Sequence, residues 1–158
     1  MDGFRMVWDG KSFISRQGKV FTAPEWFKAG MPKKPLDGEL FLGRGMFNGI
    51  QAAMACGWRG LRYMVFDCPL VQGGFSERLE DLKSLSFPAH CQLVPQEPVE
   101  GIEAMMAFAG DVVASGGEGA VVRAPRAVYT AGRTSDVLRW VPQDPALNRK
   151  TKTRLALV

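Results

Sequence analysis

The stretch LDGELFLGRG, residues 36–45, sets two carboxylates in an apolar frame and ends on an arginine between two glycines. Asp37 and Glu39 are two residues apart, so on a β-strand their side chains point to the same face. Burying two carboxylates is costly unless a cation or a hydroxyl group meets them. We therefore expect this strand to line a ligand site. Taken alone, the stretch also fits a polar-faced edge strand that ends in a turn.

Length and composition predict one globular domain. Of the 158 residues, 46% are apolar and 23% are charged, which excludes the disordered and fibrous classes. No run of about twenty apolar residues occurs, so we expect no membrane partner. The start, MDGFRMVWDG, has neither a basic leader nor an apolar targeting core and predicts a strand. Because the first residues predict a strand, we expect the chain to be a fragment or a shortened protein. The sequence does not decide between a cytoplasmic and a periplasmic location.

The spacing of the cysteines and the single histidine argues against a zinc site. Cys56, Cys68 and Cys91 have no CxxC spacing, and His90 beside Cys91 lacks further ligand partners. We therefore expect three free thiols that act as small core residues.

The basic charge gathers in the last part of the chain. Residues 123–158 contain eight basic and two acidic residues, a net charge of +6, which leaves −2 for the remainder. A basic end on a nearly neutral body suits a phosphate-rich partner, although a solvated basic tail gives the same count.

Turn residues and apolar spacing predict an α+β domain with largely antiparallel sheets. Asp9-Gly10 predicts a hairpin turn between strands at 2–8 and 11–15, and residues 92–99, interrupted by Pro95 and Pro98, predict an edge strand. Ser76 is the expected cap of one of the helices. The expected helices are 24–29, 46–55, 76–85 and 102–114, and the other expected strands are 36–42, 61–66, 119–124 and 137–141.

Six short motifs follow one another in a specific order. They are Asp2-Gly3-x-Arg5, Ser15-Arg16-x-Gly18, Asp37-Gly38-Glu39-Leu40, Phe66-Asp67, Glu118-Gly119-x-Val121-x-Arg123 and Leu138-Arg139. In this order they resemble the nucleotidyltransferase (adenylation) domain of ATP-dependent DNA ligases, whose motifs are KxDGxR, SRxG, DGEL, FD, EGxxxR and a closing strand with lysines. WDG at 8–10, APEWF at 23–27 and LDGELFLGRG make the small bacterial ligases the most similar.

The resemblance implies a fold and a reaction. The fold would be an ATP-grasp-like nucleotidyltransferase domain over residues 1–142, with two packed, largely antiparallel sheets flanked by helices around a nucleotide cleft. Residues 143–158 would be a basic tail or linker. The reaction would seal nicks in duplex DNA, in replication, repair and recombination, through enzyme-AMP and DNA-adenylate intermediates. ATP and Mg²⁺ would be required, and the protein would act as a monomer.

The same resemblance assigns roles to individual residues. Glu39 would accept hydrogen bonds from the ribose hydroxyls, Phe66 would stack on adenine, and Glu118 would help to hold the metal. Arg5 and Arg16 would bind the terminal phosphate of the nick, where a planar guanidinium suits a phosphate.

Three further assignments complete the expected site. Asp2 would order the surroundings of the nucleophile, Arg139 would face the adenylate phosphate, and Arg133 in YTAGRTSD would touch DNA phosphate. We expect Glu39, Phe66 and Glu118 to converge on one pocket for adenosine and its first phosphate.

The sequence departs from the family pattern at two positions, and it ends near the point where the family continues into a further domain. The nucleophilic lysine of the pattern would stand immediately ahead of Met1, so we expect the chain as printed to be inactive, as a truncated chain would be. Val141 stands where such ligases usually carry a second lysine. After residue 145 the chain is too short for the oligonucleotide-binding (OB) barrel that follows in the family.

Two other functions remain open at this point. A catalytically dead module that binds nicked DNA is favoured by the lost lysine, Val141 and the basic tail. RNA ligation or mRNA capping on the same fold is the other, and LDGELFLGRG and APEWF weigh against it.

Overall fold

The computed structural model describes residues 2–132 and 134–141. The chain divides into two compact units, Met1–Pro95 and Gln96–Val158, which we describe separately. The expected tail at 143–158 and Arg133 lie outside the described residues.

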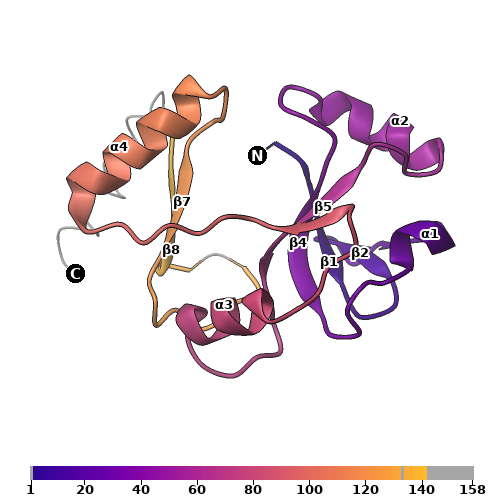
Figure 1. Cartoon of the computed structure of the whole chain (residues 1–158), viewed down its shortest axis with the longest axis horizontal. Helices are drawn as coiled ribbons and strands as arrows, with labels where there is room; N and C mark the ends of the chain where they lie inside the picture. The colour runs from indigo at the N-terminus through magenta and orange to yellow at the C-terminus, as the bar shows by residue number, and fades with distance from the viewer. Residues whose placement is uncertain (1, 133, 142–158) are drawn as a thin grey trace. The chain divides into compact units, whose positions relative to one another are not determined.

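The first unit is built on a six-stranded sheet with the order β3-β2-β1-β4-β5-β6 (Figure 1). All neighbouring strands are antiparallel except β5 and β6, which are parallel. The strand β6 lies at the edge, as expected for the segment 92–99, but it ends at Leu93, before Pro95 and Pro98. The strands are β1 (Phe4–Trp8), β2 (Phe13–Ser15), β3 (Val20–Phe21), β4 (Leu36–Phe41), β5 (Arg62–Asp67) and β6 (Cys91–Leu93).

The turn between β1 and β2 forms where the Asp-Gly pair predicted it. The Asp9 carboxylate accepts hydrogen bonds from the backbone N–H groups of Lys11 and Ser12, and Gly10 has a φ of 98°. Such an Asx turn reverses the chain at low cost because glycine tolerates positive φ.

Helices cover one face of this sheet and enclose the core. They are α1 (Glu25–Lys28), the 3₁₀ turn η1 (Phe47–Gly49), α2 (Ile50–Ala55) and α3 (Phe75–Lys83). Ser76 does not cap α3, because the helix already begins at Phe75 and the cap position is Gly74 with extended backbone angles. Residues from the strands and helices meet in one apolar cluster that includes Met6, Phe13, Phe27, Leu40 and Tyr63.

A close approach of β4 to β5 fixes the strand that carries the two carboxylates. The Tyr63 hydroxyl lies 3.0 Å from the Met6 carbonyl oxygen and 2.9 Å from that of Leu36. The Tyr63 ring fits there because Gly38 has no Cβ, which would come within 2.8 Å of the ring. The register of β4 on β5 shifts between Asp37 and Gly38, so a bulge lies directly at the carboxylate motif.

The second unit is a helix packed on a two-stranded sheet. Helix α4 (Gly101–Ala114) lies along the antiparallel pair β7 (Ala120–Arg123) and β8 (Val137–Trp140) (Figure 1). Its core consists of Met105, Ala109, Ala120 and Trp140. The α+β class expected from the sequence is confirmed, and the strands form one large and one small sheet.

The cysteines differ in part from the sequence expectation. Cys68 and Cys91 are buried free thiols, but Cys56 is exposed just after α2, so the expectation of three core cysteines is wrong for Cys56. Within residues 2–132 and 134–141, none of the helices is long and apolar enough to cross a membrane.

Candidate functional site

One face of the six-stranded sheet carries the polar residues of the motifs. Because side chains alternate along a strand, Leu36 and Leu40 of β4 point into the core while Asp37 and Glu39 point to the other face. Arg5 lies on the neighbouring strand β1, directly opposite Glu39, and its guanidinium lies over the ring of Phe66 on β5. We call this set, Arg5, Asp37, Glu39 and Phe66, the polar face.

The buried carboxylate of Asp37 forms an ion pair with Arg5, as expected for a carboxylate removed from water. Arg5 donates from Nε to Asp37 Oδ1 at 3.1 Å and from Nη2 to Asp37 Oδ2 at 2.6 Å. The Asp37 side chain is fully buried, whereas that of Arg5 is 46% exposed. The guanidinium carbon lies 5.6 Å from the centroid of the Phe66 ring. Asp37 therefore orients the arginine toward the aromatic ring and the solvent, an arrangement that two parallel N–H···O bonds make specific.

Glu39 anchors the first residues of the chain. Its Oε1 accepts a hydrogen bond from the backbone N–H of Gly3 at 2.6 Å. A Cβ on Gly3 would lie 2.7 Å from Glu39 Cγ and would collide with the Leu40 carbonyl oxygen, so only glycine fits there. The backbone next to Asp2, which is half-buried, is thus tied to the polar face.

A second buried ion pair lies next to the polar face, and sequence reasoning missed it. Arg78 of α3 donates to both carboxylate oxygens of Asp67, at 2.6 and 3.3 Å, and to the Gly73 carbonyl oxygen at 3.2 Å. The two side chains are 2% and 7% exposed, and Asp67 follows Phe66 directly in β5. The available signal was spacing, since Arg78 stands three residues after Phe75 and four before Leu82, the other buried residues of α3.

Arg16 is presented by a tight turn. The turn between β2 and β3 is closed by hydrogen bonds from Ser15 N–H to Lys19 O at 2.8 Å and from Gly18 N–H to Ser15 O at 2.9 Å. Arg16 is exposed, and among the described residues it has no ion-pair partner. An unpaired guanidinium on a fixed turn is suited to bind a phosphate.

The second unit brings Glu118 and Arg139 together. Arg139 of β8 donates from Nη2 to Glu118 Oε2 at 2.6 Å, and the two side chains are 56% and 49% exposed. Gly119, between Glu118 and β7, has a φ of 153° and runs so close to Trp140 that a Cβ would collide with its carbonyl oxygen. This close contact fixes Glu118 at the start of β7.

The predicted site residues thus fall into two groups. Arg5, Glu39 and Phe66 share one face in the first unit, and Glu118 and Arg139 form a pair in the second. The expected convergence of Glu39, Phe66 and Glu118 spans both units and stays a prediction.

A single carboxylate suits the Mg²⁺ that the resemblance implies, but it does not suit zinc. Within the described residues, no group of three or more His, Cys, Asp or Glu side chains could hold a metal ion. Zinc needs such a group, whereas Mg²⁺ in nucleotide enzymes is commonly held by one or two carboxylates together with substrate phosphates and water. The exposed carboxylate of Glu118 fits that second kind of site.

The buried thiols do not supply a nucleophile. Burial, together with the charge of Asp81, raises the pKa of Cys68 to about 11, and burial raises the pKa of Cys91 to about 12. Both thiols are therefore protonated at neutral pH, and a protonated thiol is a poor nucleophile.

Comparison with known proteins shows similarity to DNA ligases. No protein-family model matches the chain. The DNA ligase of Haemophilus influenzae is 36% identical over 146 residues, which are 88% of this chain and 54% of the ligase. Over these residues the chain is similar to one part of a DNA ligase.

Solved structures of DNA ligases share the fold of this chain. A Lig E DNA ligase, described as binding DNA with a minimal scaffold, has a TM-score of 0.80 and 30% identity, covering 89% of this chain and 59% of its own. The Chlorella virus DNA ligase-adenylate has a TM-score of 0.73 and 23% identity, over 89% and 58% of the two chains, a likeness in fold alone. The chain spans a little over half the length of these ligases.

Proposed function

We propose that this chain is the adenylation module of an ATP-dependent DNA ligase that seals nicks in duplex DNA. The observation that carries the proposal is the polar face, because Arg5, Glu39 and Phe66, each from one of the motifs, lie on three adjacent strands. In the polar face, the ring can stack on a base, the carboxylate can accept hydrogen bonds from a ribose, and the cation can bind a phosphate.

The proposed reaction consists of three phosphoryl transfers. A lysine nitrogen attacks the α-phosphorus of ATP and pyrophosphate leaves. An oxygen of the 5′ phosphate at the nick then displaces the lysine, and the 3′ hydroxyl finally displaces AMP and joins the strands. Positioning and neutralisation of charge supply most of the catalysis in such steps. Glu118 would help to hold Mg²⁺, which would supply positive charge to the phosphates.

The chain's own residues would position the substrates. Phe66 would stack on adenine, and Glu39 would accept from the ribose while it holds Gly3, and with it the segment just after the nucleophile. Asp37 holds the Arg5 guanidinium beside the Phe66 ring, where it would face the phosphate. Arg139 would exchange its contact with Glu118 for the adenylate phosphate when metal and nucleotide bind.

The 158 residues alone should not form the covalent adenylate, because no lysine stands two residues before Asp2. The experiment compares the chain with two versions that carry Met-Lys or Met-Arg ahead of Met1. After incubation with ATP and Mg²⁺, intact-mass measurement should show one added AMP on the lysine version alone. If none of the three chains takes up AMP, the proposal is wrong.

Two observations favour a second candidate, a DNA-binding module without catalysis. Val141 replaces the second lysine of the closing strand, and Arg139 engages the carboxylate that would hold metal. This candidate predicts that the lysine version binds nicked DNA with a steep salt dependence but never takes up AMP. Nicked DNA and nicked RNA, each tested with ATP and GTP, separate the DNA ligase from an RNA-ligating or capping enzyme.

A further inference from the structure

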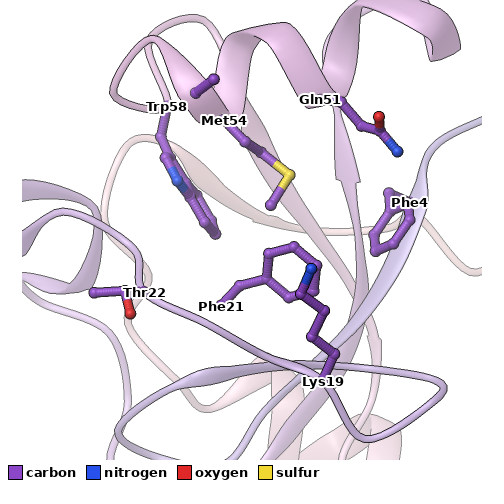
Figure 2. A pocket seen from close by; sticks show the side chains of 8 residues that line it. Phe4, Lys19, Phe21, Thr22, Gln51, Met54 and Trp58 are labelled. Carbon is purple, nitrogen blue, oxygen red and sulfur yellow. The ribbon is translucent and has the colours of Figure 1, made fainter.

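A hollow of about 390 Å³ opens in the first unit between the start of β1, strand β3 and helix α2 (Figure 2). Its lining includes the apolar side chains of Phe4, Phe21, Met54 and Trp58, with Lys19 and Gln51 among the polar ones. We call it the α2 hollow.

The α2 hollow is separate from the polar face. Phe4 and Arg5 are neighbours on β1, so their side chains point to opposite sides of the sheet. Arg5 belongs to the polar face, whereas Phe4 packs against the core and lines the hollow. A ligand in the hollow would therefore be additional to the nucleotide proposed above, and the inference does not rest on that proposal.

Trp58 forms a rigid wall of the hollow. Its side chain is only 3% exposed, and its ring centroid lies 5.4 Å from that of Phe13 and 4.9 Å from that of Phe27. Its φ of 66° is the only positive φ of a non-glycine residue in the described chain. A bulky residue rarely adopts this conformation, so the surrounding structure must hold it there.

The indole N–H of Trp58 has no hydrogen-bond partner among the described residues. By contrast, the indole N–H of Trp8 donates to Pro32 O at 2.7 Å, and that of Trp26 donates to Gly57 O at 3.2 Å. No fully buried side-chain nitrogen or oxygen in the described residues lacks a partner, so the Trp58 N–H must reach solvent. Since Trp58 lines the hollow, we take the hollow as the place where this donor is open to a ligand.

A cation and an aromatic ring stand on the other side of the hollow. Lys19 Nζ lies 5.1 Å from the centroid of the Phe21 ring, and Gln51 adds an amide at the rim (Figure 2). The lining therefore offers a flat apolar surface, a fixed N–H donor and a positive charge. A planar heteroaromatic ring with acceptor atoms and an attached phosphate matches all three.

We propose that the α2 hollow binds a nucleotide. The base ring packs against Phe21 and Met54, an acceptor atom of the base receives the Trp58 N–H, and the phosphate pairs with Lys19. A free nucleotide and a nucleotide of a DNA strand share this chemistry, and the experiment separates the two sources.

The test is NMR of the indole N–H groups in the full ¹⁵N-labelled chain, titrated with AMP or with a short single-stranded DNA. The Trp58 signal, identified by its loss in Trp58→Phe, should shift saturably while the Trp8 signal stays. A shift with AMP assigns the site to free nucleotides, and a shift with the oligonucleotide alone assigns it to a DNA strand.

Variants test whether the shift of the Trp58 signal reflects binding in the α2 hollow. Lys19→Gln should weaken binding about tenfold because it removes a charge-assisted contact. Lys11→Gln, at an equally exposed lysine in the turn before β2, should leave it unchanged. Phe66→Ala removes the proposed adenine contact and should leave the Trp58 shift intact, so the two proposals fail separately. A Trp58 signal that stays fixed with both probes, or a response unchanged in Lys19→Gln, overturns the inference.

Discussion

Replacing Arg78 with methionine should strongly destabilise the first unit. The guanidinium is 2% exposed and donates to both oxygens of Asp67, whose side chain is 7% exposed. Asp67 also lies opposite Asp37 in the register of β4 and β5, so loss of the arginine leaves a buried charge near a second carboxylate. Breaking a buried pair from one side costs about 3–5 kcal/mol. With a urea dependence of about 1–3 kcal/mol per molar, the midpoint should fall by roughly 2 M.

Urea unfolding followed by circular dichroism measures this effect. Asp67→Asn combined with Arg78→Met should recover most of the loss, because the pair is then removed from both sides while Asn still accepts from the Cys68 N–H. Arg59→Met, at an exposed arginine, serves as the matched control. A loss below about 1 kcal/mol for Arg78→Met, similar to the control, would refute the reasoning.

Three further changes have defined outcomes. Gly3→Ala should lower the unfolding free energy by about 1–3 kcal/mol, measured by thermal denaturation, because its Cβ would lie 2.7 Å from Glu39 Cγ; an unchanged Tm would contradict the close contact. Cys56 should react with a thiol reagent at pH 8 while Cys68 and Cys91 stay protected. Because their pKa values of about 11 and 12 exceed the ordinary 9.0, the unfolding free energy should fall as pH rises above 9.0, and stability that is constant up to pH 12 would disagree. Arg16→Gln should weaken the binding of nicked DNA, measured by fluorescence anisotropy, and should reduce the slope of log affinity against log salt concentration by about 1. The control is Lys28→Gln, which should change neither quantity because Lys28 is paired with Glu25. Equal slopes for the two variants would argue against a phosphate contact at Arg16.

Much of the fold followed from local signals in the sequence. The Asp9-Gly10 pair predicted the turn between β1 and β2, and the expected helices 24–29, 76–85 and 102–114 overlap α1, α3 and α4. Such signals act over a few residues, so they are visible without tertiary context.

The features that were missed depend on distant partners. Arg78 was overlooked because an isolated arginine on a helix is usually solvated, and only the position of Asp67 makes its burial favourable. Ser76 is an ordinary cap residue, but α3 begins earlier, where Phe75 is buried. The contact between Arg5 and Asp37 required the register of β1 on β4, which the motifs alone do not contain.

The yield of covalent adenylate in single-turnover reactions tests the central claim, that Glu39, Phe66 and Glu118 serve one nucleotide. The lysine-extended chain would be compared with its Glu39→Gln, Phe66→Ala and Glu118→Gln variants in ATP and Mg²⁺. We predict that each variant loses about 100-fold in rate, because each removes a contact to the same reacting nucleotide. Full activity in any one of the three variants would contradict the account.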